Sequence, residues 1–247
     1  MTTATTTLRA SLERLCEEYR PSRHAFFPAL RGAPSSALRD PDVLGELYLR
    51  YQAAMHATRV MVYFLPHLDS PPLRARKLRI FIDDDGLQGG DTHHAQLARL
   101  FRRIGGRLPL ADDEFGDLEP LARRLDPGTA RFVEKVSDLY HRSLGPWCIV
   151  ELVSDDWMRT LADGLAVHHP AVREEAYFAE CFQGHVEERH GQEALALTEL
   201  VLSARPQLLE ETLAGAREMA QSLDGLWSSL ESVLAAARAP AAAQRGA

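Results

Sequence analysis

The sequence predicts an all-α protein, built as a single bundle of about eight helices. Two observations predict this class. Apolar residues recur about every 3.6 residues along almost the whole chain, which is the period of an amphipathic helix. Strand-like alternation is scarce, and prolines and glycines gather between the periodic segments.

The helix boundaries follow from those prolines and glycines. Proline lacks the backbone N–H that a helix interior needs, and glycine accepts the left-handed backbone that often ends a helix. In chain order these residues stand at Pro21, Gly32–Pro34, Pro66, Pro71–Pro72, Gly86–Gly90, Gly105–Gly106, Pro127–Gly128, Gly145–Pro146, Pro170 and Pro206. The segments between them predict helices at residues 7–19, 42–65, 72–84, 92–104, 128–144, 147–166, 171–203 and 207–237.

One domain accounts for the predicted helices. We expect residues 1–237 to form a single helical domain, because neither a repeat nor a long linker divides them. The Ala-rich residues 238–247 predict a flexible tail.

The composition is typical of soluble globular proteins. The 247 residues are 45% apolar and 26% charged, and the net charge of −7 argues against a nucleic-acid partner. No stretch approaches about 18 consecutive apolar residues, so we expect no membrane partner. The three cysteines contain no CxxC pair, which predicts a reduced, cytoplasmic protein.

The first candidate site residue is Glu151, an acid on an apolar helix face. Trp147, Val150 and Met158 fall on one stripe of the predicted helix, and Glu151 lies in the centre of that stripe. A carboxylate there needs a partner, because burying an unpaired charge is costly. An ion pair or hydrogen bond would satisfy it, and so would a role as metal ligand or catalytic acid or base.

A second set lies in the helix predicted at 171–203. Gln183, Glu187 and His190 are spaced i, i+4, i+7 and therefore share one side of that helix. Glu-x-x-His pairs also occur by chance on helix surfaces. On an apolar stripe, the pair matches the way di-iron sites are built in helical bundles. His185 points to a more polar side and is a weaker candidate.

A third set surrounds the glycine-rich segment at residues 86–90. His94 lies on the same side as the apolar residues that follow it, so we expect it to face inward. Asp84 stands ten residues before His94 and Asp91 three before, and on an unbroken helix both intervals return to a similar side. Asp91 is equally suited to cap the helix that starts near residue 92.

His56 is the fourth candidate, a histidine among apolar residues of the helix predicted at 42–65. Such a residue is more often a satisfied core histidine than a ligand, and both interpretations stay open. The remaining histidines, including His93, have no comparable context and are expected at the surface or in loops.

Together these features resemble the heme-oxygenase-like di-iron oxidases, also called iron-containing redox enzymes, relatives of the TenA and PqqC folds. The resemblance covers most of the chain. RHAFFPALRG is similar to the family's opening His-Pro-Phe segment, and LRARKLRIFIDDDGLQGGDTHHAQLARLF to its acidic stretch before a His-Ala-x-Leu helix. GPWCIVELVSDDW is similar to its Gly-then-Glu helix, and FQGHVEERH to its His-x3-Asp-x2-His helix.

The resemblance implies a heme-oxygenase-like bundle that holds iron between its helices. Glu151 and His190 are then also the expected catalytic groups. The implied metal ligands are His94, Glu151, Glu187, His190 and either Asp84 or Asp91.

Two departures from the family pattern bear on the number of ions. Gln183 stands where the family has histidine, and the acid of that motif is Glu187 where the family has aspartate. We therefore expect two Fe(II) ions, or one if the missing nitrogen ligand is not replaced. We place His56 and Gln183 at the substrate side of the site, with His56 as an alternative nitrogen ligand.

The implied activity is oxidation of a small molecule by dioxygen. Carboxylate and imidazole ligands with open positions suit iron or manganese. The resemblance implies desaturation, oxidative C–C cleavage or N-oxygenation of an amino acid or fatty acid in specialised metabolism, and a homodimer. Arg59 is a candidate partner for a substrate carboxylate, although a surface position is the commoner outcome for arginine.

Two alternatives compete with this interpretation. One is a metal-free enzyme of the TenA or PqqC type, in which Glu151 and His190 act as acid and base. The other is a non-catalytic helical partner protein whose ligand set has decayed, which Gln183 favours.

Overall fold

The computed structural model confirms the all-α class. It describes residues 3–61, 65–66, 68, 70–84, 91–110, 121, 123–183 and 185–238, and all regular secondary structure in this part of the chain is helical. The α-helices are α1 (Thr3–Glu18), α2 (Phe26–Arg31), α3 (Pro41–Met61), α4 (Pro71–Asp84), α5 (His93–Arg103), α7 (Pro127–Arg142), α8 (Gly145–Ala166), α9 (Ala176–Gln183), α10 (Val186–Ala204) and α11 (Leu209–Arg238). The 3-10 helices are η1 (Pro21–Arg23), η2 (Ala37–Arg39), η5 (Pro170–Glu174) and η6 (Pro206–Leu208).

Two sequence expectations concern the ends and the surroundings of this bundle. The predicted tail at 238–247 begins with the last residue of α11, and residues 239–247 lie outside the described part of the chain. None of the described helices is long and apolar enough to cross a membrane.

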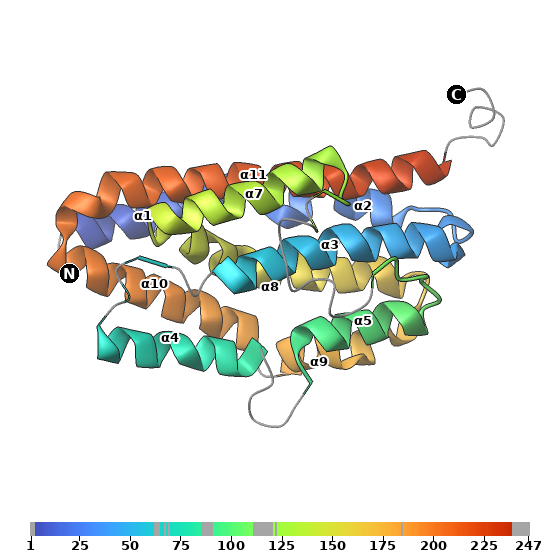
Figure 1. Ribbon diagram of the computed structural model, residues 1–247, viewed down its shortest axis with the longest axis horizontal. Helices are drawn as coiled ribbons and strands as arrows, with labels where there is room; N and C mark the ends of the chain where they lie inside the picture. Colours follow the sequence, from blue (N-terminus) through green and yellow to red (C-terminus); the bar gives the residue numbers. More distant parts are fainter. Residues whose placement is uncertain are drawn as a thin grey trace.

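The helices pack around α8. This helix contacts α10, α11 and α2, while α3 packs against α7, α11 and α5, and α9 against α5, α8 and α10. Figure 1 shows the long helix α11 running along one side of the bundle with α7 next to it. The four consecutive residues Trp147–Val150 of α8 are all buried and point about 100° apart, so this helix is buried around most of its circumference, as a central helix must be.

Capping residues stand at the start of α7 and of α5. The Asp126 carboxylate accepts hydrogen bonds from the Gly128 and Thr129 N–H groups at the start of α7, at 2.9 and 3.3 Å. The Thr92 hydroxyl accepts from the Ala95 N–H at 3.1 Å and caps α5. These bonds satisfy donors that the first turn of a helix leaves open.

The prediction of one continuous helix at 171–203 is wrong. The structure has η5, α9 and α10 in its place. His185, between α9 and α10, has a φ of 50°, and a residue in this left-handed conformation interrupts helical backbone. Gly184 precedes it in the sequence and is a boundary signal that the apolar period conceals. Gln183 therefore ends α9, whereas Glu187 belongs to α10.

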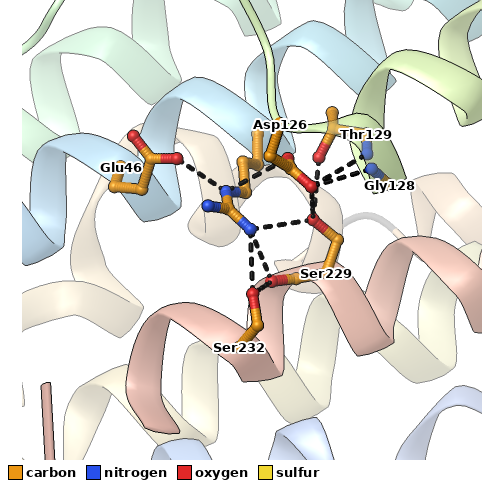
Figure 2. Close-up of polar contacts among 7 residues, drawn as sticks. Glu46, Asp126, Gly128, Thr129, Ser229 and Ser232 are labelled. Carbon is orange, nitrogen blue, oxygen red and sulfur yellow. Dashed lines mark hydrogen bonds and ion pairs between the residues drawn. The ribbon is translucent and has the colours of Figure 1, made fainter. Parts of the chain in front are cut away.

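A polar network joins α3, α7 and α11 (Figure 2). Arg50 of α3 forms ion pairs with Glu46 at 2.7 Å and with Asp126 at 3.2 Å. Arg50 also donates to the Ser229 carbonyl at 2.8 Å and to the Ser232 hydroxyl at 3.0 Å. The Ser229 hydroxyl donates to the Asp126 carboxylate at 2.9 Å. These contacts connect helices that lie far apart in the sequence.

Candidate metal centre

Two acids and one histidine from neighbouring helices converge inside the bundle. Glu151 of α8 and Glu187 and His190 of α10 each offer a ligand atom, and these atoms lie within 4.8 Å of one another. Glu187 is 8% exposed and His190 is 3% exposed, while Glu151 is half-buried. In the described part of the chain, this is the one group of three such residues that could hold an ion.

The local sequence explains why Glu187 and His190 point the same way. Glu187 stands in the first turn of α10 and His190 three residues later, and this i, i+3 spacing places both side chains on one face of a helix. The beginning of a helix carries a partial positive charge, which favours a carboxylate such as Glu187 there. Because the helix breaks at His185, a new helix begins just before Glu187, and the Glu-x-x-His pair lies at its start.

A close approach of two helices brings Glu151 to that pair. Gly191 follows His190, and a Cβ atom built on Gly191 would lie 3.0 Å from the Glu151 carbonyl oxygen and 3.3 Å from the Leu152 Cα. The absence of a side chain at Gly191 thus lets α10 lie directly on the backbone of α8. This contact determines the separation of the three candidate ligands.

Trp147 orients the Glu151 carboxylate. The indole N–H of Trp147, one turn earlier on α8, donates to the Glu151 Oε1 at 2.8 Å. The indole is buried, at 1% exposure, so its position is held by packing. A hydrogen bond to a ligand of this kind aligns it for the metal.

The donor set fits a divalent cation with oxygen and nitrogen ligands. Ligand atoms lie about 2.0–2.2 Å from such an ion, so two of them are at most about 4.4 Å apart. The ligand atoms lie up to 4.8 Å apart, so they must approach one another by several tenths of an ångström to bind one ion, and small side-chain rotations allow this. Two carboxylates this close repel each other, and a cation between them removes that repulsion.

An inner cavity of about 50 Å³ adjoins this group. Glu151 and Glu187 are part of its wall, and residues of α3, α7, α8 and α9 complete it. A water molecule needs about 10–15 Å³ of such space, so the cavity holds roughly three or four water-sized atoms. Its other polar lining residues are Tyr51, Thr58, Arg59, Tyr140, Ser154, Trp157 and Tyr177.

The tyrosines of this cavity differ in how their hydroxyls are bonded. Tyr51 and Tyr177 share a hydrogen bond of 3.0 Å, and the Tyr51 hydroxyl also contacts the Met158 sulfur at 3.2 Å. The Tyr140 hydroxyl is buried and has no hydrogen-bond partner among the described residues, which costs about 1–3 kcal/mol in an isolated case. Burial, and then the charge of Glu151, raise the pKa of Tyr140 well above its ordinary value.

A larger groove reaches the same acids from outside. Its volume is about 550 Å³, and Glu151 and Glu187 line it as well as the inner cavity. Arg20, Arg159 and Glu188 stand along it, and Arg159 pairs with Asp155 at 2.7 Å. The two carboxylates thus have an inner cavity and an outer groove in common.

None of the other predicted site residues whose side chains are described belongs to this three-residue group. The His94 ring packs edge to face against the His56 ring with centroids 5.7 Å apart, and neither residue belongs to the three-residue group. Asp91 is exposed and pairs with Arg99. It does not cap α5 as predicted, because Thr92 is the capping residue of that helix. The side chains of Asp84 and Gln183, which end α4 and α9, lie outside the described part of the structure.

Sequence reasoning missed several residues at the cavity. His93 was expected at the surface but is buried, with Tyr177 packed edge to face against its ring at 5.8 Å. The His93 Nδ1 lies 3.3 Å from a guanidinium nitrogen of Arg59. Arg59 lines the inner cavity, although the sequence favoured a surface position for it. Tyr140 gave no signal, because a tyrosine on an amphipathic helix looks like any core residue.

Comparison with known proteins adds no family. The chain matches no protein-family model, and no curated protein matches it. Family membership therefore stays a prediction from the sequence motifs, and the geometry of Glu151, Glu187 and His190 is the basis for a function.

Proposed function

We propose that this protein is a non-heme iron oxidase that uses dioxygen to oxidise a small organic substrate. The observation that carries the proposal is the convergence of Glu151, Glu187 and His190 from α8 and α10. A glutamate on one helix and a Glu-x-x-His pair on another form half of the ligand set of carboxylate-bridged di-iron bundles. The described residues support one ion, and a second ion stays a prediction.

The chain's own residues have separate tasks in this proposal. Bound iron would supply one-electron and dioxygen chemistry. Glu151, Glu187 and His190 would hold it, with the two carboxylates balancing its charge. Trp147 keeps Glu151 oriented, and Met55, Val150 and Met158 form the apolar part of the inner cavity wall.

The substrate class follows from the sequence resemblance. Desaturation, oxidative C–C cleavage or N-oxygenation of an amino acid or fatty acid is the proposed reaction. The outer groove of about 550 Å³ has room for such a molecule. Oxygen consumption by the iron-loaded protein, screened over amino acids and fatty acids, tests this assignment.

Iron stoichiometry tests the metal site itself. Anaerobic reconstitution should give one or two irons per chain, and Glu187→Gln and His190→Ala should each lose at least one. Glu188→Gln is the matched control, because Glu188 is the exposed neighbour of Glu187 on the same turn and pairs with His185 at 3.3 Å. Helical circular dichroism should persist in all variants. Equal iron uptake in Glu187→Gln and Glu188→Gln would refute the site, and no uptake by the unmodified protein would favour the metal-free enzyme.

A further inference from the structure

Tyr140 is a buried polar residue that the proposed chemistry does not use. It belongs to α7, its side chain is 0% exposed, and it lines the inner cavity together with Glu151. Within the described residues, its hydroxyl has no hydrogen-bond partner. Buried hydroxyls in native proteins are nearly always bonded, so the exception indicates a ligand or water in the cavity.

The chemistry of the cavity restricts that ligand. The Tyr140 hydroxyl is neutral at ordinary pH, and its proton needs an acceptor, which an ammonium group cannot supply. With about 50 Å³, the cavity admits roughly three or four heavy atoms. The part of the ligand inside it is therefore a small acceptor, of the size of dioxygen or of a carboxylate.

Charge makes the binding of such a ligand depend on a metal ion. Glu151 and Glu187 face the same cavity, and Arg59 on its wall offsets only one of their two charges, so the metal-free protein repels an anion. A divalent cation held by these two acids and His190 offsets both charges. The ligand then lies between the cation and the Tyr140 hydroxyl.

We infer that the inner cavity is a binding site for a small acceptor ligand, which Tyr140 holds by a hydrogen bond and which binds together with the metal ion. The inference rests on the proposed function, because it requires a cation at Glu151, Glu187 and His190. Coupling between two ligands is reciprocal, so the small acceptor must also strengthen metal binding. This reciprocity gives a test that does not depend on turnover.

The test measures Fe(II) affinity by anaerobic calorimetry with and without a small anion. Azide represents a dioxygen-sized ligand, and acetate represents the carboxylate end of a substrate. In the unmodified protein, one of the two anions should tighten Fe(II) binding. In Tyr140→Phe, Fe(II) alone should bind as before, and the tightening should fall about tenfold or more, as expected for the loss of one hydrogen bond to a charged acceptor.

Tyr51→Phe is the matched control, because Tyr51 lines the same cavity but its hydroxyl is bonded to Tyr177. It should keep the anion effect. The melting temperature of metal-free Tyr140→Phe should equal or exceed that of the unmodified protein, since no hydrogen bond of the described structure is lost.

The outcomes separate the two proposals. An effect of azide alone assigns the cavity to a dioxygen-sized ligand, and an effect of acetate alone assigns it to a carboxylate. Fe(II) binding with no anion effect, or with an equal effect in Tyr140→Phe, would overturn the cavity assignment and leave the metal site standing. Failure of the unmodified protein to bind Fe(II) would overturn both.

Discussion

At the scale of single residues, the sequence names the three candidate ligands within a longer set that also includes His94, Asp84 and Asp91. Glu151 and His190 stand out because each is ionisable and lies on an apolar stripe, and the structure buries His190 and half-buries Glu151. His93 and Tyr140 give no such signal, for a physical reason. A histidine at a predicted helix start is usually exposed, and a tyrosine on an apolar face is usually core, so only packing reveals their roles.

The hydrogen bond from Trp147 to Glu151 leads to a prediction about metal affinity. Trp147→Phe keeps an aromatic ring in the core but removes the indole N–H that donates at 2.8 Å. We expect Fe(II) affinity to fall about 10–100-fold, the usual effect of losing a partner of a metal ligand. Anaerobic calorimetry measures it. Trp227→Phe, which changes a buried indole packed on Phe26 and Phe27, is the control and should leave Fe(II) affinity unchanged.

At the scale of helices, the main difference between prediction and structure is the break between α9 and α10. The apolar period continues across it, so the sequence alone indicates one helix at 171–203. The left-handed backbone at His185 interrupts that helix and starts a new one just before Glu187. The prediction that Glu187 and His190 share a face needs only the one turn of α10 that contains both, and that turn is present.

The contact of α10 with α8 leads to a prediction for Gly191. In Gly191→Ala the new Cβ would meet the backbone of Glu151 and Leu152 at 3.0–3.3 Å, so the two helices must move apart. We expect a loss of about 1–3 kcal/mol in the free energy of unfolding and weaker Fe(II) binding. Urea denaturation and calorimetry measure these two effects.

Gly225→Ala is the control for this substitution. No atom lies within 4 Å of a Cβ built at Gly225 of α11, so alanine fits there without strain. It should stabilise the protein by up to about 1 kcal/mol, because alanine is the better helix former, and should leave Fe(II) affinity unchanged. If Gly191→Ala behaved like Gly225→Ala, the close approach would not set the geometry of the site.

At the scale of the whole molecule, the network around Arg50 and Asp126 holds helices of the first and second halves of the chain together (Figure 2). Burial alone would raise the pKa of Asp126, but hydrogen bonds, with that of Thr129 the largest, and the charge of Arg50 lower it below its ordinary value. The lowered pKa means that the charged form is stabilised in the folded protein. Asp126 therefore stabilises the folded protein at any pH at which its carboxyl group is ionised.

This network predicts how stability depends on pH. Asp126→Asn keeps a capping side chain at the start of α7 but loses the pairing with Arg50. Near neutral pH, we expect a loss of about 1–2 kcal/mol in the free energy of unfolding. Because the folded-state pKa is lowered, the loss should be complete above about pH 4 and should shrink as the pH falls through the folded-state pKa.

Urea denaturation between acidic and neutral pH measures the effect. Asp163→Asn, which removes an exposed pair with Arg173, is the control and should change stability by less than about 0.5 kcal/mol. A difference between Asp126→Asn and the unmodified protein that stays constant as Asp126 protonates would contradict the assignment.

Helical class, most helix limits and the set of ionisable residues expected to face inward follow from the order of amino acids, because amphipathic periodicity and capping are local properties of a chain. Which of those inward-facing groups meet was decided only in three dimensions, where the glycine contact of α10 on α8 brings Glu151 to Glu187 and His190. The same packing left His56 and His94 against each other and Asp91 at the surface. Such outcomes depend on helix crossings between distant segments, and no local pattern encodes them.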